Sequence, residues 1–161
     1  MIQFLAIAFG SMFLVLVLNV LWDYRLIENL NRPVPHAFHA TIFTGLFLTM
    51  FLAATGVRDL WLTVSFVSNY WSIRWIFHNL ALNKLRGRDW DYLGNNTLDR
   101  LLKWINRFVP FMFVQIGVLM ASVLFVLSEC ENYFGNGDAI GAVVFVIIGL
   151  TGFIFLLSRK S

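Results

Sequence analysis

Long apolar stretches, separated by short polar connections, form the main pattern along this chain. The first 22 residues carry no charged side chain, and a helix needs about 20 residues, at a rise of about 1.5 Å each, to cross the hydrocarbon core of a bilayer. The pattern therefore predicts an all-α integral membrane helical bundle that forms one domain over residues 1–161. The five predicted transmembrane helices cover residues 2–22, 37–57, 60–82, 108–128 and 139–157.

The composition favours lipid as the surrounding solvent. Hydrophobic residues make up 59% of the chain and charged residues only 13%, whereas a soluble domain is nearer half apolar and a quarter charged. A chain with so few polar side chains cannot cover its own surface with them. Its single cysteine, Cys130, excludes an internal disulfide and a multi-cysteine metal site.

The basic residues predict how the chain is threaded. If it crosses five times, eleven of its twelve Lys and Arg residues fall on one side, and Arg58 is the exception. By the positive-inside rule this places the N-terminus outside and the C-terminus in the cytoplasm, as in a bacterial inner membrane. In a four-span alternative, residues 37–82 hold one span and an interfacial helix. That alternative divides the basic residues between both faces, so five spans are preferred.

Residues 97–107 predict a cytoplasmic amphipathic interfacial helix. Leu98, Leu101, Leu102 and Ile105 share one face at helical spacing, and polar and basic residues take the other. Such a helix lies along the cytoplasmic leaflet; the alternative is a helix packed on other helices. The neighbouring bases predict contact with anionic lipid headgroups. No nucleic-acid recognition module is present, so nucleic acid is not an expected partner.

All three histidines are predicted to converge at the cytoplasmic end of one hairpin. If the turn between residues 37–57 and 60–82 centres near residue 58, positions whose numbers sum to about 116 lie at equal depth. His39 is then level with His78, and His36 lies one turn nearer to water. One interpretation is a three-imidazole metal site for zinc or iron; the other is polar residues at a membrane interface without a ligand.

Two further polar features need partners. Arg74 lies more than a turn inside its span, where an unpaired charge is costly, and the sequence predicts a contact with Asp23 bridged by Asn19. A polar stripe also follows one face of residues 60–82. It is interpreted as a surface for helix association, with a path for protons or a small solute as the alternative. The stripe consists of Ser65, Ser68, Asn69, Ser72, Asn79 and Asn83.

The segment "YLGNNTLDRLLK" at residues 92–103, with Arg74 and "HNLALN" upstream, resembles a stretch of small bacterial and phage-encoded polytopic membrane proteins. The resemblance spans about 30 residues and implies a bacterial or viral origin, without implying any chemistry. It marks Arg74, Asn83, Tyr92, Gly94, Asp99 and Arg100 as parts of a shared cytoplasmic structure. The predicted cytoplasmic cluster consists of Asp23, Arg74, Asp89, Tyr92, Asp99 and Arg100.

Three classes of function follow from these features. The preferred one is a non-catalytic subunit or scaffold of a membrane assembly, with a protein partner or a second copy of the chain. The second is a membrane metalloprotein or enzyme that uses the cytoplasmic His, Asp and Arg residues. The third is a small oligomeric channel or transporter built on the polar stripe. No nucleotide-binding loop and no spacing typical of a catalytic triad is found.

Overall fold

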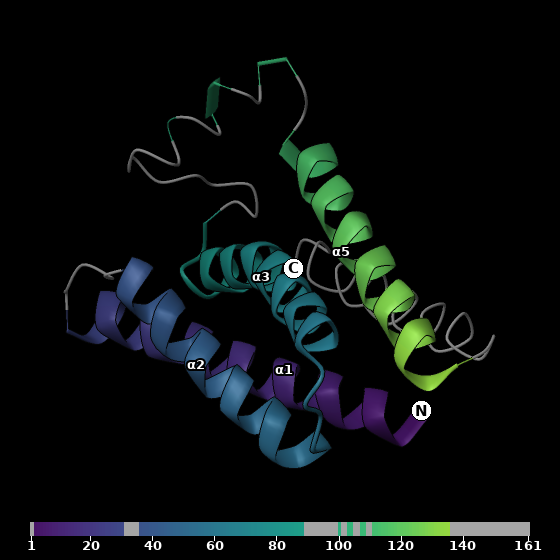
Figure 1. Ribbon diagram of the computed structural model, residues 1–161. Coiled ribbons are helices and arrows are strands. Elements are labelled where there is room, and N and C mark those ends of the chain that lie inside the picture. The colour runs from purple at the N-terminus through teal and green to yellow at the C-terminus, as the bar shows by residue number, and fades with distance from the viewer. Residues whose placement is uncertain are drawn as a thin grey trace.

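Every regular element in the described part of the chain is a helix. The computed structural model describes residues 2–30, 36–88, 100, 103–104, 107–108 and 111–135. The all-α prediction is thus confirmed over these residues. The elements, drawn in Figure 1, are α1 (Ile2–Tyr24), the π-helix η1 (Arg25–Asn29), α2 (His36–Thr55), α3 (Leu60–Leu85) and α5 (Phe111–Phe134).

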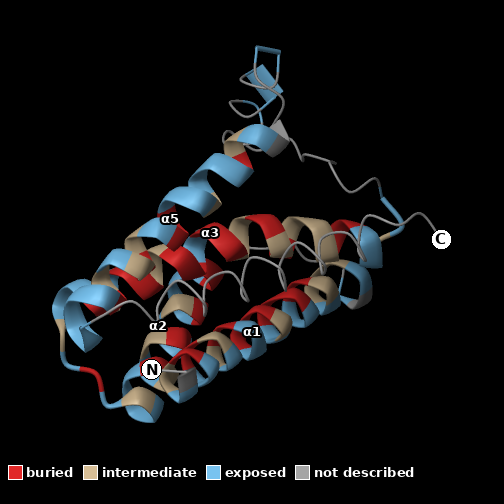
Figure 2. Ribbon diagram, turned by 90° about the vertical axis from the view of Figure 1, so that its right-hand side faces the viewer, coloured by how far each residue is buried: buried red, intermediate tan, exposed pale blue. Residues whose placement is uncertain are grey.

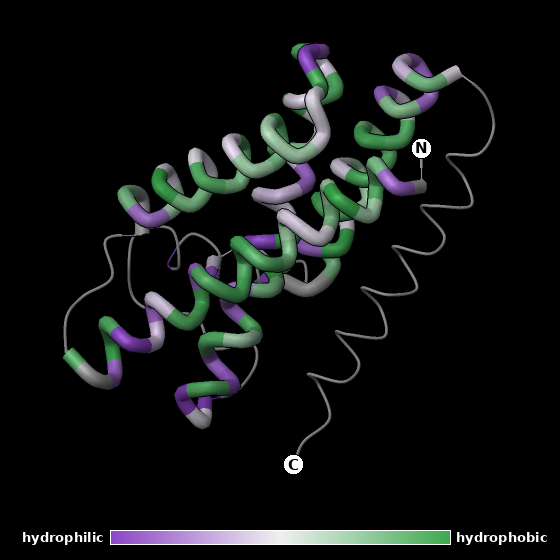
Figure 3. Tube along the Cα trace, turned by 90° about the horizontal axis from the view of Figure 1, so that it is seen from below, coloured by the Kyte–Doolittle hydropathy of each residue, from purple (hydrophilic) through white to green (hydrophobic). Residues whose placement is uncertain are grey.

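Three of these helices are long and apolar enough to cross a membrane. Their spans are Gln3–Glu28, Phe38–Thr55 and Phe113–Phe134, and Figure 3 shows that hydrophobic positions predominate along the described helices. The fifth predicted span, residues 139–157, lies outside the described residues. Of the predicted interfacial helix 97–107, only Arg100, Lys103, Trp104 and Arg107 are described, and all four are exposed.

The first helix is longer than the predicted span. The sequence places its end near Asp23, because a carboxylate is costly within lipid. The helix instead continues through Asp23 into the π-helical turn of η1, and the apolar span extends to Glu28. Asp23 is fully buried, since other side chains, rather than water, contact its carboxylate.

The helices alternate in direction, which gives the bundle two chemically different ends. Phe4, near the start of α1, lies 6.0 Å from Phe51 near the end of α2 and 5.6 Å from Phe66 near the start of α3, measured between ring centroids. The ring of Phe134, at the end of α5, lies 5.0 Å from the ring of Phe4. We call this the aromatic end. The opposite end, where Asp23, His39 and His78 meet, is the polar end.

The turn between α2 and α3 is short and has a glycine and a capping aspartate. Gly56 has a positive φ of 68°, a conformation that suits a residue without a Cβ after a helix end. The Asp59 side chain then accepts a hydrogen bond of 2.7 Å from the backbone N–H of Leu62 and caps α3. This tight connection makes α2 and α3 antiparallel.

An aromatic core fills the middle of the bundle. The rings of Phe47 and Tyr70 are stacked, with centroids 4.7 Å apart, and Phe51 and Phe66 follow toward the aromatic end, with centroids 5.0 Å apart. All four side chains are fully buried. In Figure 1, α1 and α2 lie side by side and α5 leans against α3. Figure 2 shows the buried residues of α1 along one side of that helix.

Candidate functional site

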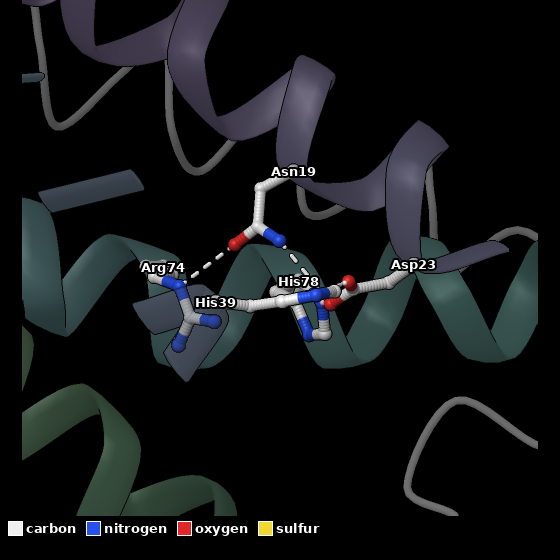
Figure 4. A network of polar contacts seen from close by, with 5 residues as sticks. All are labelled: Asn19, Asp23, His39, Arg74 and His78. Atoms are coloured by element: carbon white, nitrogen blue, oxygen red, sulfur yellow. Dashed lines mark hydrogen bonds and ion pairs between the residues drawn. The ribbon is translucent and has the colours of Figure 1, made fainter. Parts of the chain in front are cut away.

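A buried carboxylate joins three helices at the polar end. Asp23 on α1 is 0% exposed. One of its oxygens, Oδ1, contacts Nδ1 of His39 on α2, and the other, Oδ2, lies 2.6 Å from Nε2 of His78 on α3. Both imidazoles are buried as well. Figure 4 shows the two rings directed at the same carboxyl group. The level placement of His39 and His78 that the hairpin predicts is therefore present.

Asn19 and Arg74 extend this cluster. Asn19 Nδ2 donates to Asp23 Oδ2 at 3.2 Å, one helical turn along α1. Arg74 Nε on α3 donates to Asn19 Oδ1 at 2.8 Å, so the amide connects the guanidinium to the carboxylate (Figure 4). This is the predicted bridge between Arg74 and Asp23. We call the five residues the Asp23 network: Asn19, Asp23, His39, Arg74 and His78.

The chemistry of the Asp23 network is consistent with a net charge of zero. A carboxylate only accepts hydrogen bonds, so the ring nitrogens that face it carry hydrogen: Nδ1 of His39 and Nε2 of His78. A neutral imidazole satisfies this requirement. With both rings neutral, one negative carboxylate and one positive guanidinium sum to zero. That sum suits a water-poor site, because an uncompensated buried charge is very unfavourable.

The described residues cover only part of the predicted metal site. No group of three or more His, Cys, Asp or Glu side chains there is arranged to hold a metal ion. A carboxylate oxygen lies directly against each imidazole of His39 and His78. His36 begins α2, but its side chain is outside the description. A three-histidine site for zinc or iron thus stays a prediction.

The structure describes only half of the predicted cytoplasmic cluster. Asp23 and Arg74 are brought together by Asn19, whereas the Arg100 side chain is exposed. Asp89, Tyr92 and Asp99 lie outside the described residues. The sequence did not single out a second link at this end: Arg86 Nε, directly after α3, donates to Glu28 Oε1 on η1 at 2.9 Å. This ion pair is near the surface, with the Glu28 side chain 41% exposed.

One residue of the polar stripe on α3 bonds to α5. Asn69 Nδ2 donates to Ser122 Oγ on α5 at 3.1 Å. The hydroxyls of the stripe instead bond to carbonyl oxygens of their own helix, at 2.8–3.0 Å: Ser65, Ser68 and Ser72. Of the remaining two residues, Asn83 is buried and Asn79 is partly buried. Sequence reasoning overlooked Ser122. It lies seven residues after Gln115, and this interval of two helical turns places both polar residues on the same side of a largely apolar helix.

Replacement of Ser122 by alanine is expected to weaken the contact between α3 and α5. It removes the acceptor of the Asn69 amide, and such interhelical hydrogen bonds contribute about 0.6–2 kcal/mol in membrane proteins. Equilibrium unfolding of the purified protein in detergent measures this loss. Ser128→Ala is the matched control, because Ser128 is exposed on the same helix. Equal stability of the two variants would contradict the assigned role.

Three buried polar atoms have no hydrogen-bond partner among the described residues. They are Asn69 Oδ1, the Tyr70 hydroxyl and Arg74 Nη2. Tyr70 and Arg74 are one turn apart on the face of α3 that packs against the Asp23 network and the aromatic core. An unpaired buried hydroxyl costs about 1–3 kcal/mol relative to a paired one.

Tyr70→Phe is expected to change stability by at most about 1 kcal/mol, because the hydroxyl interacts electrostatically with the Arg74 guanidinium one turn away but has no hydrogen-bond partner among the described residues. The phenyl ring keeps the stacking on Phe47 while the unpaired oxygen is removed. Thermal unfolding in detergent, compared with Tyr133→Phe at an exposed position, measures the difference. A clear loss of stability would reveal a partner for this hydroxyl.

Comparison of the chain with protein-family models, with curated proteins and with solved structures gave no match.

Proposed function

We propose that the chain is a five-span integral membrane protein of a bacterium or phage that acts as a non-catalytic subunit or scaffold of a membrane assembly. The observation that carries this proposal is the Asp23 network, which joins α1, α2 and α3 through side chains that bond to one another. A protein partner or a second copy of the chain completes the assembly. Anionic lipid headgroups contact its basic face.

The direction of α3 supports its assignment as a span. Its 26 residues extend for about 39 Å at 1.5 Å each, which exceeds the roughly 30 Å of a hydrocarbon core. It runs antiparallel to α2, and its polar side chains pair with α1 and α5. Polar groups that face the interior of a bundle are tolerated within a membrane.

The distribution of charge supports the orientation. Four basic residues near the polar end are at least partly exposed: Arg25, Lys84, Arg86 and Arg88. The aromatic end has Arg58 in its turn and Glu129 and Glu131 near the end of α5. The positive-inside rule then places the polar end in the cytoplasm and the N-terminus outside.

The aromatic core gives the channel or transporter alternative less support. Phe47, Phe51, Phe66 and Tyr70 fill the interior between the polar end and the aromatic end, and all are fully buried. The hydroxyls of the polar stripe bond to carbonyl oxygens of their own helix. The enzyme alternative depends on the same histidines and carboxylate, which here are engaged with each other.

Cysteine labelling tests the threading. In a Cys130→Ser background, Arg58→Cys, Arg88→Cys and Lys160→Cys each place one thiol at a connection or the tail. A membrane-impermeant maleimide added to intact cells is expected to label position 58 only. Positions 88 and 160 should react only after the membrane is opened. Labelling of 88 and 160 on opposite faces would reject the five-span arrangement.

Native mass measurement tests the subunit role. After extraction from membranes in mild detergent, the protein is expected to have a mass greater than that of one 18.5 kDa chain. The mass of bound detergent and lipid is subtracted first. A complex that dissociates only in harsh detergent would support the assembly. A single chain in every mild detergent, and after cross-linking in membranes, would contradict it.

A further inference from the structure

We propose that Asp23, His39 and His78 form a binding site for one proton, which enters and leaves only from the polar end of the bundle. This goes beyond a scaffold role and does not depend on it. The site consists of a fully buried carboxylate with an imidazole on each oxygen. The proton is held as an imidazolium on one of the two rings.

The unused nitrogen of each ring is the position that takes the proton. Each neutral imidazole has directed its one N–H at Asp23, through Nδ1 in His39 and Nε2 in His78. The other nitrogens, Nε2 of His39 and Nδ1 of His78, are not the ones that bond to the carboxylate. A lone pair there is basic, and imidazole is the side chain that changes charge most readily between pH 5 and 8. A proton on either ring turns its bond to Asp23 into a charge-assisted one, which is stronger.

The charges around the site limit its capacity to one proton. The titratable or charged groups that face it are Asp23 from α1, His39 from α2, and Tyr70, Arg74 and His78 from α3. The Glu28–Arg86 pair lies farther out at the polar end. Of α5, the described acids and Cys130 lie toward the aromatic end. Arg74 is permanently charged, so the first proton brings the Asp23 network from zero to one positive charge. A second proton would meet two neighbouring positive charges.

Access to the site is one-sided. The side chains of His39 and His78 are 6% and 4% exposed. The side chains of the aromatic core, which lies toward the aromatic end, are 0% exposed: Phe47, Phe51, Phe66 and Tyr70. Toward the aromatic end, a proton would have to cross this core of packed rings. It therefore reaches the histidines from the polar end and returns the same way. The site senses the pH of one compartment and does not conduct protons between two.

Ring ¹⁵N NMR of the full chain, labelled at histidine and placed in lipid nanodiscs, tests the binding of the proton. Histidine signals are assigned with His36→Gln, His39→Gln and His78→Gln. At pH 8 we expect the Nδ1–H tautomer for His39 and the Nε2–H tautomer for His78. Between pH 8 and pH 5 we expect one imidazolium per chain to appear at this pair. Two neutral rings at pH 5 in folded protein, or two imidazolium ions at that pH, would overturn the proposal.

The variants His39→Gln and His78→Gln test whether each histidine can bind the proton alone. In His78→Gln, His39 retains the carboxylate and is expected to bind the proton alone over the same pH range. The reverse is expected of His39→Gln. A remaining histidine that stays neutral down to pH 5 in either folded variant would also overturn the assignment.

Proteoliposomes that contain an internal pH dye test the one-sided access. After a step in external pH, we expect the wild-type protein to leave proton flux at the level of vesicles without protein. His78→Gln is expected to show the same flux. A wild-type flux above this background that His78→Gln abolishes would refute access from one side only.

Discussion

Asp23→Asn is expected to destabilise the protein by about 3–5 kcal/mol, the range measured when one partner of a buried ion pair is removed. The substitution keeps the shape of the side chain but removes the negative charge that balances Arg74. It also places an NH₂ group against one of the two imidazoles, in the position of an oxygen that accepted a hydrogen bond. Equilibrium unfolding in mixed micelles, followed by tryptophan fluorescence, measures the loss.

Glu28→Gln is the matched control for this prediction. It breaks the Glu28–Arg86 pair, which also joins η1 to α3 at the polar end but is partly exposed to solvent. Exposed ion pairs contribute at most about 1 kcal/mol. A loss in Asp23→Asn no larger than the loss in Glu28→Gln would show that the buried carboxylate does not hold the three helices together.

Position along the axis of the helical bundle is the property of this site that the sequence predicts well. Both helices of the α2–α3 hairpin rise equally per residue from a short turn, so the numbers of His39 and His78 are sufficient to place them level. The spacing of Asn19 and Asp23 likewise puts both on one face of α1, within reach of Arg74. These inferences need only helical geometry and the position of the turn.

Rotation of each helix about its axis is the property that the sequence predicts poorly. α1 and α2 are apolar almost all the way round, so their pattern hardly distinguishes a face toward the bundle from a face toward lipid. For this reason the sequence allows the interpretation that the three histidines bind a metal ion. In the structure, His39 and His78 face the carboxylate of Asp23. The rotation is decided by packing, including the stack of Phe47 on Tyr70.

The end of the first span shows the same limit in another form. A charged residue after 22 uncharged ones predicts a boundary, because an unpaired carboxylate is unfavourable in lipid. Asp23 is paired, and its partners come from residues 16 and 55 positions along the chain. A pattern within one helix cannot contain partners on other helices. The helix therefore continues to Asn29.

The second large effect is expected from Arg74→Met, and it should depend on pH. At pH 8, with both histidines neutral, the variant leaves the Asp23 network with one negative charge in a buried site. The expected loss is about 3 kcal/mol, the lower end of the range for breaking a buried pair, because Asn19 separates the two charges. Equilibrium unfolding of wild type and variant at pH 8 and at pH 5.5 measures the loss at each pH.

At pH 5.5 the loss in Arg74→Met should be smaller, and the sign follows from the charge count. One proton on His39 or His78 brings the variant from minus one to zero, whereas it brings the wild type from zero to plus one. The proton is therefore bound more tightly by the folded variant than by the folded wild type, and acid stabilises the variant relative to the wild type. Arg58→Met, an exposed arginine at the aromatic end, should show a small effect that is equal at both pH values. If Arg74→Met lost the same stability at pH 5.5 as at pH 8, Arg74 would not supply the counter-charge of Asp23.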